Sequence, residues 1–284
     1  MNLYIVLIQY GEKLSGEVNC LISRIRSDYK ITSIEVVRTD VPLGSNYICD
    51  VNECMEFSGY QEGLHRCISH IESASLDAVS YAKIIFINDT FLSSHSRSAA
   101  IYMLNKLMAV NVESGQNIIC GELKKKPSFI FSEDEFSYYL PTWIFAIAAD
   151  ISALKKLRFY VRSECGENFS KAVWSSVSPI YSNAINQWLN PTSFFKGWYK
   201  SVPGYLLNDL ELLRKRIAIY NEHMLLQRLL RIGFGVNDIR ESMLCHQKII
   251  FFAYSMLDRL FINWIKIKYR AKFHILKYFR GVAL

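Results

Sequence analysis

Several signals that are common in other proteins are missing from this chain. The seven cysteines form no Cys-x-x-Cys pair, are irregularly spaced and odd in number, so they support neither a zinc ribbon nor a disulfide framework. No Gly-x-Gly-x-x-Gly follows the first predicted strand, which argues against a dinucleotide-dependent enzyme of the Rossmann type. No basic leader precedes that strand either. We therefore expect free thiols, a reducing compartment and a cytoplasmic protein.

The net charge of +7 is confined to the carboxyl-terminal tail, residues 246–284. This tail holds eight lysines or arginines against Asp258 alone, so the rest of the chain is neutral overall. Its large apolar and aromatic residues never form an uninterrupted run of the roughly 20 that cross a bilayer. A basic, aromatic-rich amphipathic helix is typical of attachment to an anionic membrane surface. The apolar content is too high for an arm that follows phosphates, so we expect no nucleic-acid partner.

Alternating strand-like and helix-like segments predict an α/β fold, a mostly parallel sheet flanked by helices. About half of the residues are apolar, which is enough for a full core. A long helix over 210–232 is predicted to end at Gly233, a favourable capping residue. The predicted strands cover 3–8, 34–38, 84–87 and 129–131. One more predicted helix ends near residue 26, and the others cover 60–73, 98–108 and about 146–154.

The apolar run Ile84–Ile87 is typical of a central strand that is covered on both faces. It ends in Asn88-Asp89-Thr90, at the carboxyl edge where open α/β sheets bind ligands. Oxygen-bearing side chains at this place suit a hard cation or a sugar hydroxyl. The alternative is a simple turn, because asparagine and aspartate favour turns.

Two more segments leave a structural and a functional interpretation open. Glu222 lies on an apolar stripe of the helix over 210–232, so it is either paired with Lys215 or Arg216 or placed in a cleft as a base with a raised pKa. Periodicity alone favours the structural interpretation, and it favours His223 as a hydrogen-bonded core residue. The small residues Ser58, Gly59 and Gly63 either let a backbone approach a ligand or belong to a loop that leads into a surface helix.

Taken in order, these motifs resemble bacterial polysaccharide-biosynthesis glycosyltransferases of the GT-A fold, including relatives of the rhamnan-synthesis group from O-antigen and capsule clusters. The resemblance covers roughly residues 2–235. It implies a GT-A-like Rossmann-type domain over 1–245 and basic, membrane-associating helices over 246–284. The residues that carry it are Ser58-Gly59-Tyr60-x-x-Gly63-Leu64, Asn88-Asp89-Thr90, Thr142-Trp143-x-Phe145 and Glu222-His223-x-x-x-x-Arg228-Leu229.

The resemblance implies a metal-dependent transferase that takes its sugar from a nucleotide-sugar donor. Asp89 matches the acidic residue that holds a divalent cation, Mn²⁺ or Mg²⁺, on the donor diphosphate. Asn88 stands where the family often has a second carboxylate, and His246 is a candidate metal ligand. The candidate donor-binding residues are Tyr10, Gly11, Asp40, Gly59, Asn88 and Asp89.

The acceptor implied by the resemblance is a lipid-linked glycan at the cytoplasmic face of the inner membrane. Glu222 matches the base of inverting members, and Arg228 is expected to neutralise the leaving diphosphate. Trp143 is expected to contact the acceptor, since aromatic faces stack on sugar rings. The alternative is a catalytically silent scaffold that binds the membrane and an assembly complex, because histidine and asparagine replace acids of the family pattern.

Overall fold

The computed structural model describes the central sheet, the helices around it and part of the tail. It covers residues 2–9, 31–38, 48–50, 56–74, 81–88, 97–110, 115–126, 138–159, 174–191, 209–241, 248–250, 252–253, 256–257, 259–260, 263–268 and 270–271. Within these ranges, no helix has both the length and the apolar character required to cross a membrane. The predicted strand over 129–131 and the predicted helix that ends near residue 26 lie outside them.

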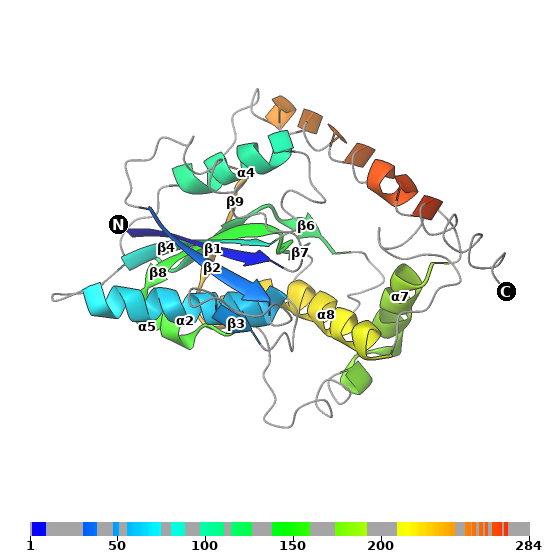
Figure 1. Cartoon of the computed structure of the whole chain (residues 1–284), viewed down its shortest axis with the longest axis horizontal. Coiled ribbons are helices and arrows are strands. Elements are labelled where there is room, and N and C mark those ends of the chain that lie inside the picture. The colour runs from blue at the N-terminus through cyan, green and yellow to red at the C-terminus, as the bar shows by residue number, and fades with distance from the viewer. Residues whose placement is uncertain are drawn as a thin grey trace.

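A mixed seven-stranded sheet forms the centre of the molecule, with the strand order β3-β2-β1-β4-β8-β5-β9 (Figure 1). β8 runs antiparallel to its neighbours β4 and β5, whereas the other neighbouring pairs are parallel. The carboxyl ends of the parallel strands therefore share one edge with the start of β8. The strands are β1 Asn2–Gln9, β2 Ile31–Arg38, β3 Ile48–Asp50, β4 Tyr81–Asn88, β5 Ile118–Gly121, β8 Ile144–Asp150 and β9 Gly235–Asp238.

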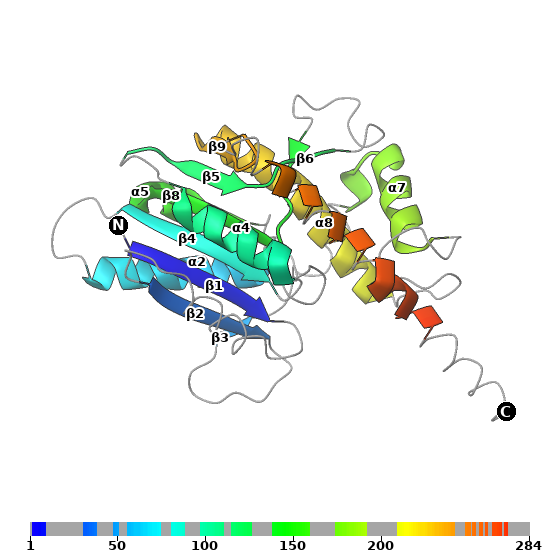
Figure 2. The same cartoon turned by 90° about the horizontal axis from the view of Figure 1, so that it is seen from above.

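Helices cover both faces of the sheet, which confirms the predicted α/β fold (Figures 1 and 2). One face packs against α2 (Glu56–Ala74), α5 (Ile151–Lys156) and α8 (Asp209–Arg231), and the other packs against α4 (Arg97–Ala109). Side chains alternate between these layers along β1, as expected for a strand. Helix α7 (Pro179–Leu189) packs on α8. Strands β6 (Lys124–Lys125) and β7 (Tyr138–Tyr139) form a separate two-stranded ribbon.

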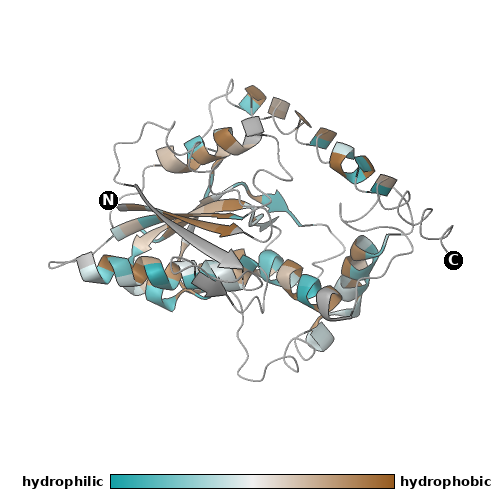
Figure 3. Ribbon diagram, viewed as in Figure 1, coloured by the Kyte–Doolittle hydropathy of each residue, from teal (hydrophilic) through white to brown (hydrophobic). Residues whose placement is uncertain are grey.

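The predicted central strand is confirmed as β4, between β1 and β8. Every residue from Ala82 to Asn88 is buried, which explains why its apolar residues do not alternate with polar ones. Figure 3 shows the hydrophobic residues concentrated in these central strands, while the helices carry polar residues on their outer sides.

The predicted cap of the long helix is also confirmed. α8 ends at Arg231, and Gly233 follows with a φ of 91°, a conformation that glycine adopts without strain. The Gly233 N–H donates to the Leu230 carbonyl (3.0 Å), and the Phe234 N–H donates to the Leu229 carbonyl (3.1 Å). These two bonds form a Schellman motif, which satisfies carbonyls at the helix end.

The helix predicted over about 146–154 is wrong in its first half, because residues 144–150 form strand β8. The alanines of this segment favour a helix in isolation, but here they are buried between β4 and β5 and complete the ladder of backbone hydrogen bonds. The helix begins only after Asp150, whose side chain accepts a hydrogen bond from the Ala153 N–H (2.7 Å) as an N-cap.

The small residues after residue 57 serve the contact between α2 and the sheet. They belong to the helix itself and not to a loop before it. A Cβ atom added to Gly63 would lie 2.3 Å from Val6 Cγ1, and one added to Gly59 would lie 3.0 Å from Ile8 Cδ1. The close approach that these glycines permit is therefore to β1. The donor-binding role of Gly59 stays a prediction.

Lys83 offers a test of how α4 is held against the sheet. Its buried Nζ donates to the carbonyls of Met108 (3.0 Å) and Val110 (2.7 Å) at the end of α4. We expect Lys83→Met to lower the free energy of unfolding by about 2 kcal/mol or more, since buried acceptors lose their donor. Urea denaturation measures the loss of unfolding free energy. Lys156→Met, at an exposed lysine, serves as the control.

The same variant has an expected pH signature. Burial lowers the pKa of Lys83 to about 8. Between about pH 8 and the ordinary lysine value near 10.4, the unfolded chain binds a proton that the folded protein does not, so Lys83 makes the stability rise with pH. Lys83→Met removes this contribution, so its deficit is expected to grow across this window. A deficit that stays constant would contradict the assigned protonation.

Candidate functional site

The sheet changes its direction of winding between β1 and β4. From β1 the chain continues to β2 and β3 on one side, and it later returns to β4 on the other side. In open α/β sheets, ligands bind outside the carboxyl ends of the strands at such a switch point. Ile8 pairs with Asn88 there, at the ends of the two strands. The predicted donor and metal residues Tyr10, Gly11, Asp40, Asp89 and His246 all lie outside the described residues, so their roles stay predictions.

Thr142 connects the end of β4 to the neighbouring elements. The Asn88 N–H donates to the Trp143 carbonyl (3.2 Å), and Asn88 Nδ2 donates to the Thr142 carbonyl (3.4 Å). The Tyr60 hydroxyl, from α2, donates to the same Thr142 carbonyl at 2.5 Å. The turn before β8 is therefore fixed to both β4 and α2.

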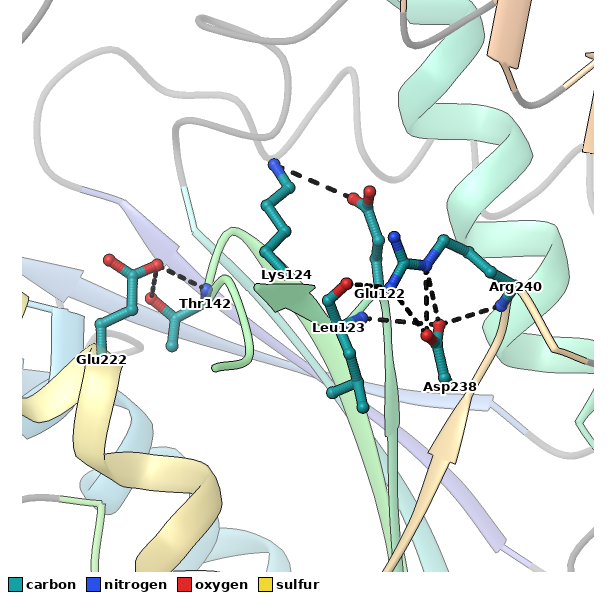
Figure 4. A network of polar contacts seen from close by, with 7 residues as sticks. All are labelled: Glu122, Leu123, Lys124, Thr142, Glu222, Asp238 and Arg240. Atoms are coloured by element: carbon teal, nitrogen blue, oxygen red, sulfur yellow. Dashed lines mark hydrogen bonds and ion pairs between the residues drawn. The ribbon is translucent and has the colours of Figure 1, made fainter. Parts of the chain in front are cut away.

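The turn at Thr142 also holds Glu222 of α8. The Thr142 N–H donates to Glu222 Oε1 at 3.0 Å, and the Thr142 hydroxyl donates to the same oxygen at 3.4 Å (Figure 4). The other carboxylate oxygen points away from Thr142. Glu222 is partly exposed, and among the described residues its hydrogen bonds all reach Oε1. Glu222 is thus bonded to the turn before β8, a partner that the sequence did not predict.

The surroundings of Glu222 make its carboxylate more basic than usual. Burial raises its pKa above the ordinary value, and the hydrogen bond from the Thr142 N–H offsets part of that rise. Glu56 raises the pKa further, whereas Lys215 and Lys124 lower it. A carboxylate that is held at one oxygen and made more basic by burial is suited to accepting a proton at the other oxygen.

His223 is a structural neighbour of this carboxylate, as the sequence predicted. It is buried, and its Nδ1 lies 2.8 Å from the Tyr181 hydroxyl of α7. The Tyr139 ring of β7 packs edge-on against it. Burial lowers the pKa of His223 to about 4, with a further contribution from Lys126, so the imidazole is neutral near pH 7. Its role is to join α7 and β7 to α8.

Arg228 makes structural contacts at the end of α5. It follows Glu222 by six residues, which separates the two side chains by about 120° around the axis of α8. Its guanidinium donates to the Asn221 side chain (2.9 Å) and to the Phe159 carbonyl (2.7 Å). Arg228 thus ties α8 to the segment that follows α5, and its predicted role at the leaving group stays a prediction.

Trp143 is largely buried. Only 8% of this residue is exposed, and it belongs to the hydrophobic cluster between the sheet and α4 that also contains Leu3, Ile87 and Met103. The apolar environment explains the placement, because a tryptophan buries a large area when it fills a core. The predicted contact of Trp143 with an acceptor sugar stays a prediction.

Sequence reasoning missed a second polar group at this edge, formed by Glu122, Lys124, Asp238 and Arg240 (Figure 4). Arg240 pairs with Asp238 at 2.8 Å and donates to the Leu123 carbonyl, which fixes β9 to the chain after β5. Lys124 lies between this pair and Glu222 in Figure 4. The available signal was a second Asn-Asp dipeptide, at residues 237 and 238, which ends β9. Asn88 likewise ends β4, and Asp89 follows it in the sequence.

The described residues provide no ready metal centre. They contain no group of three or more histidine, cysteine, aspartate or glutamate side chains placed to hold an ion. The predicted ligands Asp89 and His246 were not among the residues searched.

Comparison of the chain with protein-family models, with curated proteins and with solved structures finds no match. The geometry of the sheet edge is therefore the basis on which we infer a function.

Proposed function

We propose that this protein is a glycosyltransferase that moves a sugar from a nucleotide-sugar donor to a lipid-linked glycan acceptor in bacterial surface polysaccharide synthesis. One observation carries the proposal. The end of β4, at the switch point of the sheet, and the carboxylate of Glu222 are both hydrogen-bonded to Thr142. A ligand site of the α/β sheet and a basic carboxylate thus lie on either side of one residue.

In the proposed reaction, Glu222 takes the proton of the acceptor hydroxyl on its free oxygen. The acceptor oxygen attacks the anomeric carbon, and the bond from that carbon to the nucleotide diphosphate breaks. Attack in line with the leaving group inverts the configuration of the sugar. The fixed position of Oε1 supports this role, because a base held in one orientation needs no reorganisation before the proton moves.

The donor site in this proposal comprises Tyr10, Gly11, Asp40 and Asp89, with Asn88 at the end of β4. A divalent cation held by Asp89 would supply positive charge to the diphosphate. The GT-A fold is part of the same proposal. A mixed α/β sheet with its polar groups at the carboxyl edge supports it at the level of architecture.

We further propose that the tail holds the enzyme on the cytoplasmic face of the inner membrane. The described residues of the tail are helical, and many of their large apolar side chains are exposed. On an ideal α-helix, at 100° per residue, the sequence positions of six of them fall within an arc of about 120°. Cations flank this arc, and Lys268 lies 5.1 Å from the Trp264 ring. The six residues, named here the tail stripe, are Ile249, Phe252, Met256, Leu260, Trp264 and Ile267.

Calorimetric titration with UDP-, GDP- and dTDP-sugars, with and without Mn²⁺, tests the function directly. We expect one of these donors to bind in the presence of Mn²⁺, and we expect Asp89→Ala to weaken its binding more than tenfold, because the cation on the diphosphate would lose a ligand. Glu72→Ala, an exposed carboxylate on α2 that pairs with Lys155 of α5, is the matched control. No affinity for any nucleotide sugar would favour the silent scaffold instead.

A further inference from the structure

The turn between β7 and β8 connects more elements than a simple connection requires. Thr142 is 1% exposed, yet its backbone and hydroxyl take part in hydrogen bonds with α2, β4 and α8. The residues it contacts lie far away in the sequence, at 60, 88 and 222. Packing alone does not require the hydroxyl, because valine is nearly isosteric with threonine and differs from it by that polar group.

The hydroxyl of Thr142 has a different task from its backbone. The Thr142 carbonyl accepts hydrogen bonds from Tyr60 and Asn88, whereas the N–H and the hydroxyl both donate to Glu222 Oε1. Donors aimed at a carboxylate stabilise its ionised form and fix its orientation. The hydroxyl of Thr142 thus bonds Glu222, whereas the backbone of Thr142 also bonds Tyr60 and Asn88.

We propose that Thr142 is a positioning residue that fixes the Glu222 carboxylate relative to the end of β4. This inference depends on the proposed function, because it assigns Thr142 a part in the proton transfer to Glu222. Thr142 does not touch the reacting atoms. It sets the distance between the proton acceptor and the donor site, and it keeps Oε1 occupied so that Oε2 remains for the acceptor hydroxyl.

Other charged groups around Glu222 remain unchanged when Thr142 is substituted, so the hydroxyl can be tested alone. The titratable neighbours are Glu56 of α2, Lys124 of β6, Tyr139 of β7, Tyr181 of α7, and Lys215 and His223 of α8. Thr142→Val removes one hydrogen bond and keeps the shape and the backbone bonds. Thr142→Ser restores the hydroxyl.

The test compares the pH dependence of kcat/KM in the wild type, Thr142→Val and Thr142→Ser. We expect the acid limb of Thr142→Val to move by about 0.5 to 1 pH unit toward higher pH, since the carboxylate loses a donor. Thr142→Ser is expected to return the limb to its wild-type position. An unmoved limb in a Thr142→Val enzyme that still needs Glu222 would overturn the inference and leave the proposed function intact.

A second measurement does not require activity. The melting temperature lost in Thr142→Val is expected to be larger above the pKa of Glu222 than below it, because the hydroxyl bonds the ionised carboxylate more strongly. In a Glu222→Gln background the loss should not depend on pH. A loss that is equal at all pH values in both backgrounds would overturn the inference. A wild type that transfers no sugar would overturn the proposed function, and this measurement would then decide separately whether Thr142 holds the carboxylate.

Discussion

Glu222→Gln is expected to lower the rate of sugar transfer by about 10²- to 10⁴-fold, which is the usual contribution of a general base. Glutamine keeps an oxygen that can accept from the Thr142 N–H, so the contact at 3.0 Å is retained. It cannot take the proton of the acceptor hydroxyl. Steady-state kinetics should show the loss in kcat, with little change in the affinity for the donor measured by calorimetry.

The stability of this variant separates catalysis from packing. Burial raises the pKa of Glu222, so the folded protein holds a proton that the unfolded chain has already released at intermediate pH. The wild type therefore loses stability as the pH rises from the unfolded value through the raised value. Glutamine removes this loss, and we expect Glu222→Gln to melt no lower than the wild type at pH 8. A lower melting temperature with an unchanged transfer rate would show that Glu222 is only a core residue.

The second large effect is expected at the membrane. Leu260→Glu combined with Trp264→Glu should reduce binding to phosphatidylglycerol vesicles by at least about tenfold, because each large apolar side chain buried in lipid contributes about 1.5–3 kcal/mol. Both residues are more than half exposed and lie in the tail stripe. Cosedimentation with the vesicles measures the bound fraction. Phosphatidylcholine vesicles should bind the wild type weakly, since they offer no anionic surface to the flanking lysines.

Ile180→Glu is the matched control for the tail variant. Ile180 is 60% exposed on α7, so the substitution adds the same charge at an exposed apolar position outside the tail. Its vesicle binding should equal that of the wild type. Equal binding by the tail variant and the wild type would contradict membrane attachment through the tail stripe.

The parts of the fold that could be predicted are those whose sequence pattern is enforced locally. The apolar run before Asn88 reflects one dominant cause, the burial of β4 on both faces. The glycine after α8 reflects another, the positive φ that the helix end requires. The prediction of a helix in place of strand β8 was wrong, because the alanines and isoleucines of residues 144–150 fit a buried helix as well as a buried strand. Pairing with β4 and β5 decides the outcome, and that pairing cannot be seen in the segment itself.

The candidate site was predicted through its residues and only partly through its contacts. The apolar stripe on the helix indicated that Glu222 is unusual, but it did not indicate which residue Glu222 contacts. The structure supplies Thr142 as that partner, which lies 80 positions away in the sequence. The contacts of Arg228 with Asn221 and Phe159 could not be predicted, because a motif gives the order of residues and no direction for their side chains. Asp238 was missed because the short strand β9 has too few residues to show a period.

The bond between Thr142 and Glu222 also bears on when the protein becomes active. Its two partners come from different thirds of the chain, and each is in place only after β8 has paired with β4 and α8 has docked on the sheet. Contacts between such distant segments form late in folding, since closing the long intervening loop costs entropy first. If the proposed function holds, a nascent or partly folded chain lacks an oriented proton acceptor, and we expect no sugar transfer until synthesis of the chain has passed α8.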